Sequence, residues 1–250
     1  MMLHSPRRDL PSVGLVSHRS LRGPRLALCW GLMCGLLTWP AGLSADTFVY
    51  RDKEGKTVDV VARLVASAQG AHVLETNDGE YRLIPEAAVM KRVPGADPKP
   101  VTHDEMLQLL QKRFGAELFR GQVQSPFVLG MVLAGPLAKN HESRVTNFLR
   151  KAGAFMKNVE LAFGTFIKEI RINSKSPSFP LVVLIFEADE DFEKYAREVT
   201  GEKGLSAGSI SGFYNKMTNY LAIRMSECRT FDVPLHEAIH QQVYNRNVFQ

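Results

Sequence analysis

Two histidines and one glutamate near the C-terminal end have the types and the spacing of a metal-assisted hydrolase. His236, Glu237 and His240 stand in the stretch LHEAIHQQVYN. On an α-helix, residues four apart lie one turn apart on the same side, so both imidazoles can reach one Zn²⁺. Glu237 is turned by about 100° from His236 and can sit beside a metal-bound water, whose proton a carboxylate takes up and returns. We therefore predict His236 and His240 as zinc ligands and Glu237 as the general base.

The same three residues can also occur together by chance on an amphipathic helix. The stretch YLAIRM, which ends at Met225, favours the metal site, because it reads as an edge strand just before the helix. An edge strand can pair with an extended peptide substrate. We expect the helix to begin near Asp232, an N-cap residue, with Pro234 in its first turn. Its opposite flank, formed by Leu235, Ile239 and Val243, is expected to be buried.

A third zinc ligand is not visible in the sequence. One class of zinc peptidase needs a glycine and a histidine three and six residues after the second histidine, where this chain has Val243 and Arg246. Another class takes a glutamate from a following helix, which this chain does not reach. Glu227 can serve as a substitute only if it folds over the metal. We expect a site with two histidine ligands to bind zinc weakly.

Residues 102–250 are predicted to form a mixed α/β domain around this helix. Thr102 and Glu105 form a capping box for a first helix. Apolar residues recur at helical spacing from Glu142 to Ile170, which predicts a long amphipathic helix with its aromatic residues in the core. The other predicted elements are a strand in SPFVLGMVLAG, a buried strand in PLVVLIF, a helix from about Asp189, and a hairpin with the arms GFY and YLAIRM.

Residues 46–92 have the pattern of a small β module. Short apolar runs alternate with turn sequences such as NDGE, where Asn77, Asp78 and Gly79 are expected to supply positive-φ positions. About four antiparallel strands of this kind make an SH3-like barrel, similar to adaptor repeats of bacterial envelope proteins. A binding role and a spacer role both remain open for it. The proline-rich residues 93–101 are predicted to be a linker.

Residues 1–45 have the pattern of a secretory signal peptide. Five arginines precede a short apolar run, LALCWGLMCGLLTW, and small residues follow it. We predict export to the periplasm or cell envelope after cleavage near Ser44 or Ala45. An uncleaved membrane anchor is the alternative, although the run is shorter than the ~20 residues that span a bilayer.

The charge distribution argues against a nucleic-acid-binding protein, and the cysteine content argues against a disulfide-bonded domain. Residues 1–45 hold 5 of the 31 basic residues and one of the 26 acidic residues, so the remainder is close to neutral and predicts no nucleic-acid partner. Cys228 is the one cysteine outside the predicted signal peptide, so no internal disulfide is expected there.

Three sequence blocks together resemble a known group. PLVVLIFEADEDFEKYAREV, SGFYNKMTNYLAI and LHEAIHQQVYN, in this order, are similar to an uncharacterised family of bacterial secreted proteins grouped with the peptidase-MA-like gluzincins. The resemblance covers roughly residues 120–250 and implies His236 and His240 as zinc ligands and Glu237 as the base. Gln241 and Asn245 match positions that are often polar. The glutamate ligand and its helices have no counterpart here, so a shortened gene, a fragment or lost catalysis all remain open.

The predicted fold is therefore α+β: a small SH3-like β-barrel followed by an incomplete zincin-like α/β domain that ends on the HExxH helix. The predicted function is a zinc metallopeptidase-like protein that acts on a peptide or protein substrate, with little activity in this chain. A non-catalytic envelope protein that binds a partner through the β module is the alternative. Contact with a membrane is expected only through the signal segment, if that segment is uncleaved.

Overall fold

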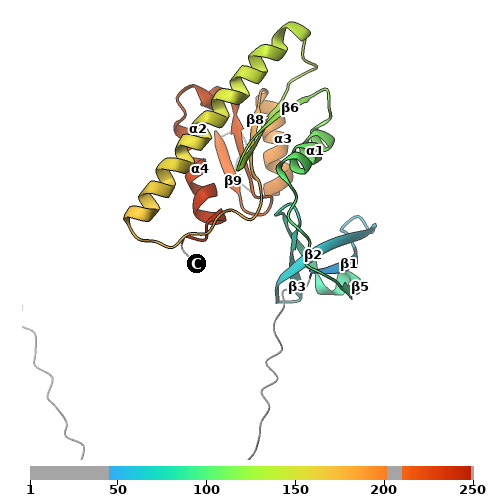
Figure 1. The fold of residues 1–250 in the computed structure, drawn as a ribbon. Coiled ribbons are helices and arrows are strands. Elements are labelled where there is room, and N and C mark those ends of the chain that lie inside the picture. Colours follow the sequence, from blue (N-terminus) through green and yellow to red (C-terminus); the bar gives the residue numbers. More distant parts are fainter. Residues whose placement is uncertain (1–44, 202–209, 249–250) are drawn as a thin grey trace, which may run out of the picture. The chain divides into compact units, whose positions relative to one another are not determined.

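The computed structural model describes residues 45–201 and 210–248, in an α+β fold with two five-stranded sheets and four α-helices (Figure 1). The predicted signal peptide lies outside the described residues except for Ala45. The described residues belong to one compact unit. Among the described residues, no helix is long and apolar enough to span a bilayer.

The first sheet is antiparallel, with the strand order β4-β3-β2-β1-β5. Its strands are β1 (Ala45–Arg51), β2 (Thr57–Ala68), β3 (Ala71–Thr76), β4 (Tyr81–Pro85) and β5 (Val89–Pro94). The fifth strand was not predicted, and it continues into the first residues of the expected linker. No pairing of β4 with β5 closes the sheet among the described residues, so the structure shows an antiparallel sheet without a closed barrel.

The core of this first sheet is small. Phe48, Ala62 and Leu74 are completely buried, and Ile84 is nearly so. The turn between β3 and β4 closes through hydrogen bonds between Thr76 and Glu80 and between Gly79 and Thr76. Of the three turn residues expected to have a positive φ, only Gly79 has one, at 83°. A glycine suits this position because it has no Cβ to clash in the left-handed region.

The second sheet is mixed and has the strand order β6-β7-β8-β10-β9. Its strands are β6 (Phe119–Gln124), β7 (Phe127–Val132), β8 (Leu181–Phe186), β9 (Gly212–Asn215) and β10 (Tyr220–Arg224). Sequence reasoning missed β6, which forms a hairpin with β7. The YLAIRM stretch is also not an edge strand, because β10 lies between β8 and β9. The edge strand next to the last helix is therefore β9.

The four helices cover both faces of the second sheet, as Figure 1 shows. They are α1 (His103–Phe114), α2 (Glu142–Glu169), α3 (Asp189–Thr200) and α4 (Asp232–Asn245). Helices α2 and α4 pack on one face, and α1 and α3 on the other. The predicted capping box at Thr102 and Glu105 is present at the start of α1.

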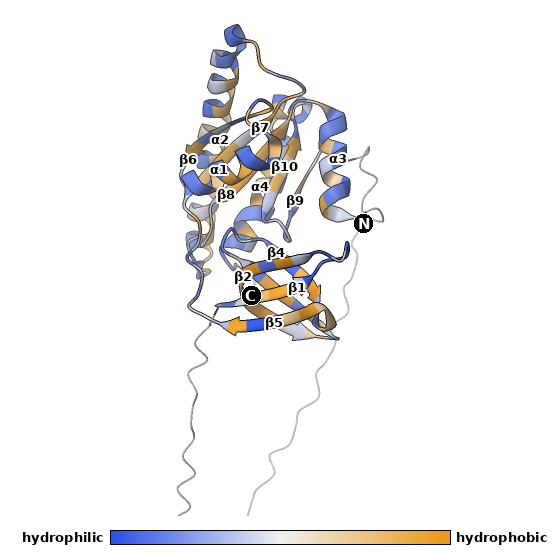
Figure 2. Ribbon diagram, turned by 90° about the vertical axis from the view of Figure 1, so that its right-hand side faces the viewer, coloured by the Kyte–Doolittle hydropathy of each residue, from blue (hydrophilic) through white to orange (hydrophobic). Residues whose placement is uncertain are grey.

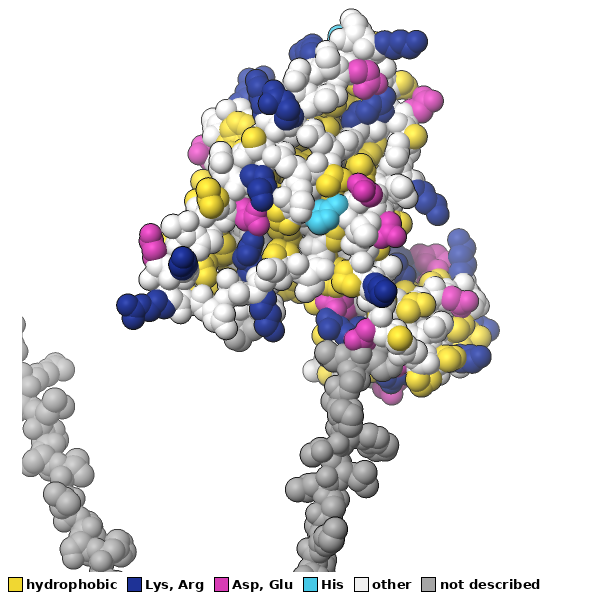
Figure 3. Space-filling view, viewed as in Figure 1, with side chains coloured by type: hydrophobic (Ala, Val, Ile, Leu, Met, Phe, Trp, Pro, Cys, Tyr) yellow, Lys and Arg dark blue, Asp and Glu magenta, His cyan; other side chains and the backbone are white. Residues whose placement is uncertain are grey.

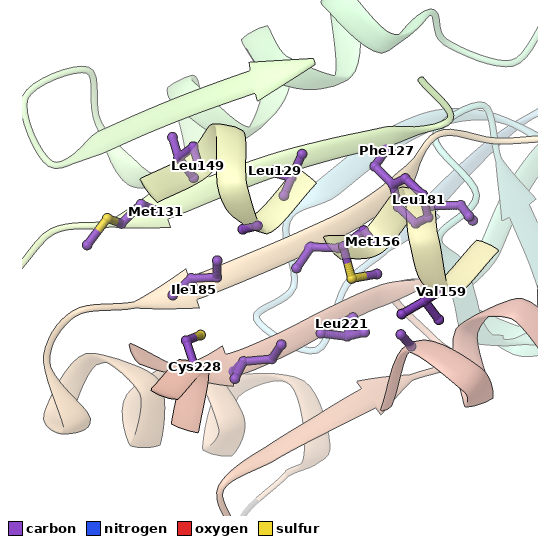
Figure 4. Packing of buried hydrophobic residues seen from close by; sticks show 14 of the residues in the cluster. Phe127, Leu129, Met131, Leu149, Met156, Val159, Leu181, Ile185, Leu221 and Cys228 are labelled. Atoms are coloured by element: carbon purple, nitrogen blue, oxygen red, sulfur yellow. The ribbon is translucent and has the colours of Figure 1, made fainter. Parts of the chain in front are cut away.

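Strand β8 lies at the centre of this arrangement and is apolar along its whole length (Figure 2). All six of its residues are buried, as the continuous apolar run predicted. Leu181 and Ile185 face Met156 and Leu149 of α2 in the cluster drawn in Figure 4. Val182 and Leu184 belong to the cluster on the other face. Because both faces of β8 are buried, its pairing with the neighbouring strands is fixed, and this positions β10, against which α4 packs.

Helix α2 has the predicted bounds within one residue, but its apolar face is only partly buried. Met156 and Leu149 are nearly inaccessible, whereas Phe166 is 55% exposed and Ile170 is 45% exposed. The expectation that all aromatic residues of this helix lie in the core is therefore wrong for Phe166. The second sheet is shorter than the 28-residue helix, so its last turns extend beyond the strands that could cover them.

Candidate functional site

Helix α4 carries the three predicted site residues and begins where the sequence places it. Asp232 is its first residue and not its N-cap, because the cap position is held by Phe231 in a left-handed conformation with φ 62°. The Phe231 ring packs on Phe155 of α2, with 4.5 Å between the ring centroids. This contact ties the start of α4 to α2. As predicted, α4 packs beside strand β10, and it also packs against β9.

The imidazoles of His236 and His240 face each other on the exposed side of α4. Their Nε2 atoms are 3.1 Å apart, and the ring centroids are 4.7 Å apart. Two nitrogens bound to one tetrahedral zinc at about 2.0–2.1 Å are about 3.3–3.4 Å apart. The pair therefore fits two corners of a zinc site, and only a small rotation of either ring is needed.

A third metal ligand is not brought to this pair within the described residues. No group of three or more His, Cys, Asp or Glu side chains with metal-site geometry occurs in 45–201 or 210–248. Glu227, the predicted substitute, lies in the short 3-10 helix Met225–Arg229 that precedes α4. The described residues thus bring two imidazoles together at the candidate site.

Glu237 is held by the backbone of the edge strand. Its Oε2 atom accepts a hydrogen bond from the backbone N–H of Tyr214 in β9, with an N···O distance of 2.9 Å. Its other oxygen, Oε1, has no hydrogen-bond partner among the described residues. The side chain is half-buried, whereas both histidines are exposed. Tyr214 therefore fixes the predicted base between the histidine pair and the edge of the sheet.

A polar network around Tyr214 explains Asn245, to which sequence reasoning gave no role. Asn219 and Asn245 exchange two side-chain amide hydrogen bonds, of 3.0 and 2.8 Å. The Tyr214 hydroxyl donates to Asn219 Oδ1 at 2.7 Å. Burial raises the pKa of Tyr214 far above its ordinary value, so this hydroxyl stays protonated as a donor. The network joins the C-terminal turn of α4 to the β9–β10 hairpin.

Gln241 also has a role that the sequence did not reveal. It is completely buried, and its Nε2 atom donates to the backbone carbonyl of Val182 in β8 at 2.9 Å. This bond connects the turn of α4 that carries His240 to the central strand. Because a buried polar group is costly unless it is hydrogen-bonded, the contact fixes how α4 rotates on the sheet.

A cleft of about 630 Å³ opens beside His240 and Glu237. The two aromatic rings of Tyr214 and Tyr244 lie 5.8 Å apart in its lining. The ammonium group of Lys216 lies 5.5 Å from the centre of the Tyr244 ring, within the range of a cation–π contact. The cleft thus presents aromatic faces, one cation and the predicted base side by side.

Two residues of the predicted buried flank, Leu235 and Ile239, are exposed, whereas the third, Val243, is half-buried. Each of the two side chains is 41% exposed. Together with Val159, Phe163 and Phe166 of α2 they line a nearly apolar groove of about 260 Å³. Figure 3 shows hydrophobic side chains gathered on this face around a histidine. The buried side of α4 is formed instead by Pro234, Ala238, Gln241 and Gln242.

Sequence reasoning found the three residues on α4 but missed those that hold them. Tyr214 contributes a backbone N–H, which no residue type signals. No protein-family model, no curated protein and no solved structure matches this chain.

Proposed function

We propose that the chain is a zinc metallopeptidase-like protein of the gluzincin type that hydrolyses peptide bonds with low activity. In fold terms, the second sheet and its helices form a zincin-like domain, and the first sheet is an open variant of an SH3-like module. The single observation that supports this proposal best is the pair of Nε2 atoms 3.1 Å apart, one helical turn from each other, with Glu237 beside them.

His236 and His240 hold the metal through their Nε2 atoms in this proposal. A bound Zn²⁺ supplies a Lewis acid for the scissile carbonyl and lowers the pKa of bound water. The protein's own part is proton transfer: Glu237 accepts a proton on Oε1 and returns it to the leaving nitrogen. The Tyr214 N–H holds Oε2 meanwhile, so the carboxylate keeps its orientation through both transfers.

A peptide substrate fits the exposed edge of the second sheet. Among the described residues, strand β9 pairs with β10 on one side, and the Tyr214 N–H is bonded to Glu237, so an extended chain would pair with the edge groups of β9 that Glu237 leaves open. The cleft beside His240 and Glu237 is lined by Phe213 and Tyr214 of this same strand. A peptide aligned along β9 thus brings its main chain next to the predicted base.

The proposed activity is low because the described residues offer two protein ligands and not three. A catalytic zinc normally keeps three protein ligands and one open position. With two, the metal binds less tightly and the pKa of its water is less controlled. We therefore expect weak zinc binding and slow hydrolysis from this chain.

The test is to purify residues 46–250, measure the zinc stoichiometry and dissociation constant, and assay a mixed peptide library with and without Glu237→Gln. We expect weak zinc binding and slow cleavage that the substitution abolishes. Cleavage that persists unchanged in Glu237→Gln would show that another group is the base. Tight binding of one zinc with fast cleavage would contradict the low activity and require a third ligand.

A binding role for the first sheet is the second candidate function. Large apolar side chains are exposed on this sheet, at Val61, Val65, Leu83, Met90 and Val93. Exposed apolar patches mark interaction sites in many soluble proteins. Under this alternative, Leu83→Ser with Met90→Ser removes partner binding in envelope extracts and leaves zinc affinity unchanged. If this double variant binds its partner as the original chain does, the binding role of the first sheet is contradicted.

We also propose that the protein is exported to the periplasm or cell envelope. The arginine-rich start and the short apolar run of residues 1–45 support this location. Mass spectrometry of the mature N-terminus tests it, with cleavage near Ser44 or Ala45 expected. A chain that retains Met1 and fractionates with the cytosol would contradict export.

A further inference from the structure

The turn between β3 and β4 of the first sheet lies against the hairpin that borders the histidine cleft. The backbone N–H of Tyr81 donates to the carbonyl of Met217 at 2.7 Å, in the turn between β9 and β10. The backbone N–H of Val101, just before α1, donates to the carbonyl of Asn77 at 2.8 Å. The first sheet is thus bonded to the α/β domain at the same turn that carries Lys216 into the cleft.

Gly79 marks how closely this turn approaches the domain. A Cβ atom placed on it would lie 2.9 Å from the ring of Phe179 and 3.3 Å from the side-chain nitrogen of Asn219. Non-bonded carbon atoms essentially never approach within 2.9 Å, so a side chain at position 79 must displace one of its neighbours. Asn219 is itself 3% exposed and bonded to Tyr214 and Asn245, which limits its freedom to move.

Tyr81 provides a second link, to the wall of the cleft itself. Its hydroxyl donates to Glu75 Oε1 at 2.9 Å, and Glu75 is buried and paired with Arg63. Burial raises the pKa of Tyr81 well above its ordinary value, with the neighbouring Tyr244 and Glu75 adding to the effect. Tyr244 lines the histidine cleft on one side and, on the other, a polar pocket of about 320 Å³ that Tyr81 also lines.

We propose that the β3–β4 turn, residues 76–81, is a positioning element of the histidine cleft, with Gly79 and Tyr81 as its positioning residues. Gly79 lies close beside Asn219, Asn219 bonds the Tyr214 hydroxyl, and the Tyr214 N–H holds Glu237. Tyr81 and Tyr244 line the same polar pocket, and Tyr244 also forms a wall of the histidine cleft. The first sheet is therefore part of the site and not a spacer.

The route from Gly79 to Glu237 consists of a close approach to Asn219 and two hydrogen bonds, through the hydroxyl and the backbone N–H of Tyr214. The expected effect of this route on a metal centre rests on the proposed function, whereas the link between Gly79 and Glu237 itself does not. A displacement at Gly79 should loosen the Tyr214–Glu237 bond, while a strained alanine elsewhere in the first sheet should not. This difference separates positioning from a general contribution to folding.

The chain contains a matched control for this test. Gly55 has φ 79°, close to the 83° of Gly79, but a Cβ on Gly55 would have no atom within 4 Å. Gly79→Ala and Gly55→Ala therefore share the strain of alanine in the left-handed region. Only Gly79→Ala adds the clash with Phe179.

The experiment measures two properties of the full chain and both variants. The first is backbone hydrogen exchange at Tyr214, and the second is the visible absorption spectrum of Co²⁺ added in place of zinc. We expect Tyr214 exchange to become about tenfold faster in Gly79→Ala than in Gly55→Ala. We also expect the Co²⁺ bands to shift in position or intensity in Gly79→Ala alone, because Glu237 beside the metal is less well held.

The possible outcomes test the positioning role and the proposed function separately. Equal Tyr214 exchange in the two variants overturns the positioning role. Faster exchange in Gly79→Ala with an unchanged Co²⁺ spectrum also overturns it, because the turn then supports the fold and not the site. Absence of any Co²⁺ binding by the original chain contradicts the proposed function, and Tyr214 exchange then still decides whether the link exists.

Tyr81→Phe covers the case in which Gly79→Ala does not fold. This variant keeps the ring and the backbone bond to Met217 and removes only the hydroxyl. Tyr50→Phe is its control, since Tyr50 is buried in the core of the same sheet, away from the cleft. We expect the Co²⁺ spectrum to change in Tyr81→Phe and not in Tyr50→Phe. Identical spectra in these two variants overturn the role of Tyr81.

Discussion

The carboxylate of Glu237 and the backbone N–H of Tyr214 are joined by a 2.9 Å hydrogen bond between helix α4 and edge strand β9. Glu237→Gln keeps an acceptor oxygen, so we expect thermal stability close to that of the original chain. Glu237→Ala leaves the N–H unpaired and should cost about 1–2 kcal/mol of unfolding free energy. Urea denaturation of both variants measures the difference, and equal stabilities would show that the bond contributes nothing.

Zinc binding should depend on His236 and His240 and on no other histidine of the α/β domain. Either His→Ala variant should weaken zinc binding by at least about tenfold, because one of two imidazole ligands is lost. Both side chains are exposed, so folding should change by less than about 0.5 kcal/mol. Isothermal titration with zinc provides the measurement. His141→Ala, at an exposed position before α2, is the control, and weakened binding in it would place the metal elsewhere.

Gln241→Ala should destabilise the fold by about 1–3 kcal/mol. The substitution removes the donor to the Val182 carbonyl and leaves a small cavity between α4 and β8. Gln108→Ala on the exposed side of α1 is the control and should be nearly neutral. Chemical denaturation of the two variants gives the comparison, and equal midpoints would contradict the structural role of Gln241.

The stability of the protein should fall between pH 9 and pH 11 because of Cys228. Burial raises the pKa of its thiol from 9.0 to about 11, with the Glu227 carboxylate adding to the effect. The thiol binds its proton more tightly when folded, so this contribution is complete below pH 9 and is lost as the pH rises to 11. The loss is about 2–3 kcal/mol. Burial also raises the pKa of Tyr195, to about 12, so the tyrosines add a loss of their own above pH 10.

The comparison with Cys228→Ala isolates the cysteine. This variant should be less stable at pH 8, since a buried side chain is shortened, but its stability should decline less steeply from pH 9 to pH 11. Thermal melting at several pH values measures both slopes. Parallel curves for the two proteins would show that the thiol does not titrate in this range.

Two glycines should respond in opposite directions to alanine. A Cβ on Gly130 in β7 would lie 2.4 Å from the buried ring of Phe119, so Gly130→Ala should cost about 1–3 kcal/mol. A Cβ on Gly164 in helix α2 would meet nothing within 4 Å, so Gly164→Ala should stabilise by about 0.5–1 kcal/mol. Differential scanning calorimetry tests both signs. A stabilised Gly130→Ala variant would mean that the β6–β7 packing is looser than described.

The elements with strong periodicity could be predicted from the sequence. Helix α2 and strand β8 have apolar patterns long and regular enough to fix their type and bounds. Strand β6, FRGQVQ, was missed because its alternation is weak and its glycine suggests a loop. Sheet order was also beyond the sequence: β10 was taken for an edge strand because nothing local reveals that β9 pairs outside it.

In the candidate site, too, local sequence patterns predicted some features, while others depend on tertiary packing. His236, Glu237 and His240 are found by type and spacing alone, and the structure places the two histidines together. Leu235 and Ile239 were assigned to a buried flank by their hydrophobicity, but burial depends on what packs there, and that information is tertiary. Tyr214 and Asn219 act through a backbone N–H and a paired amide, which leave no signature in the sequence.

The parallel pairing of strand β8 has a consequence for how the protein is made. Strand β8 runs parallel to both β7 and β10, so each pair needs a long connection that must be synthesised first. When Phe186 leaves the ribosome, β7 and α2 are already present, but the side of β8 that faces β10 is bare until Tyr220 to Arg224 follow. At about 5–20 residues per second this interval lasts roughly two to eight seconds. During it a strand whose six residues are all buried in the finished fold has one edge without a partner strand, where another chain could pair.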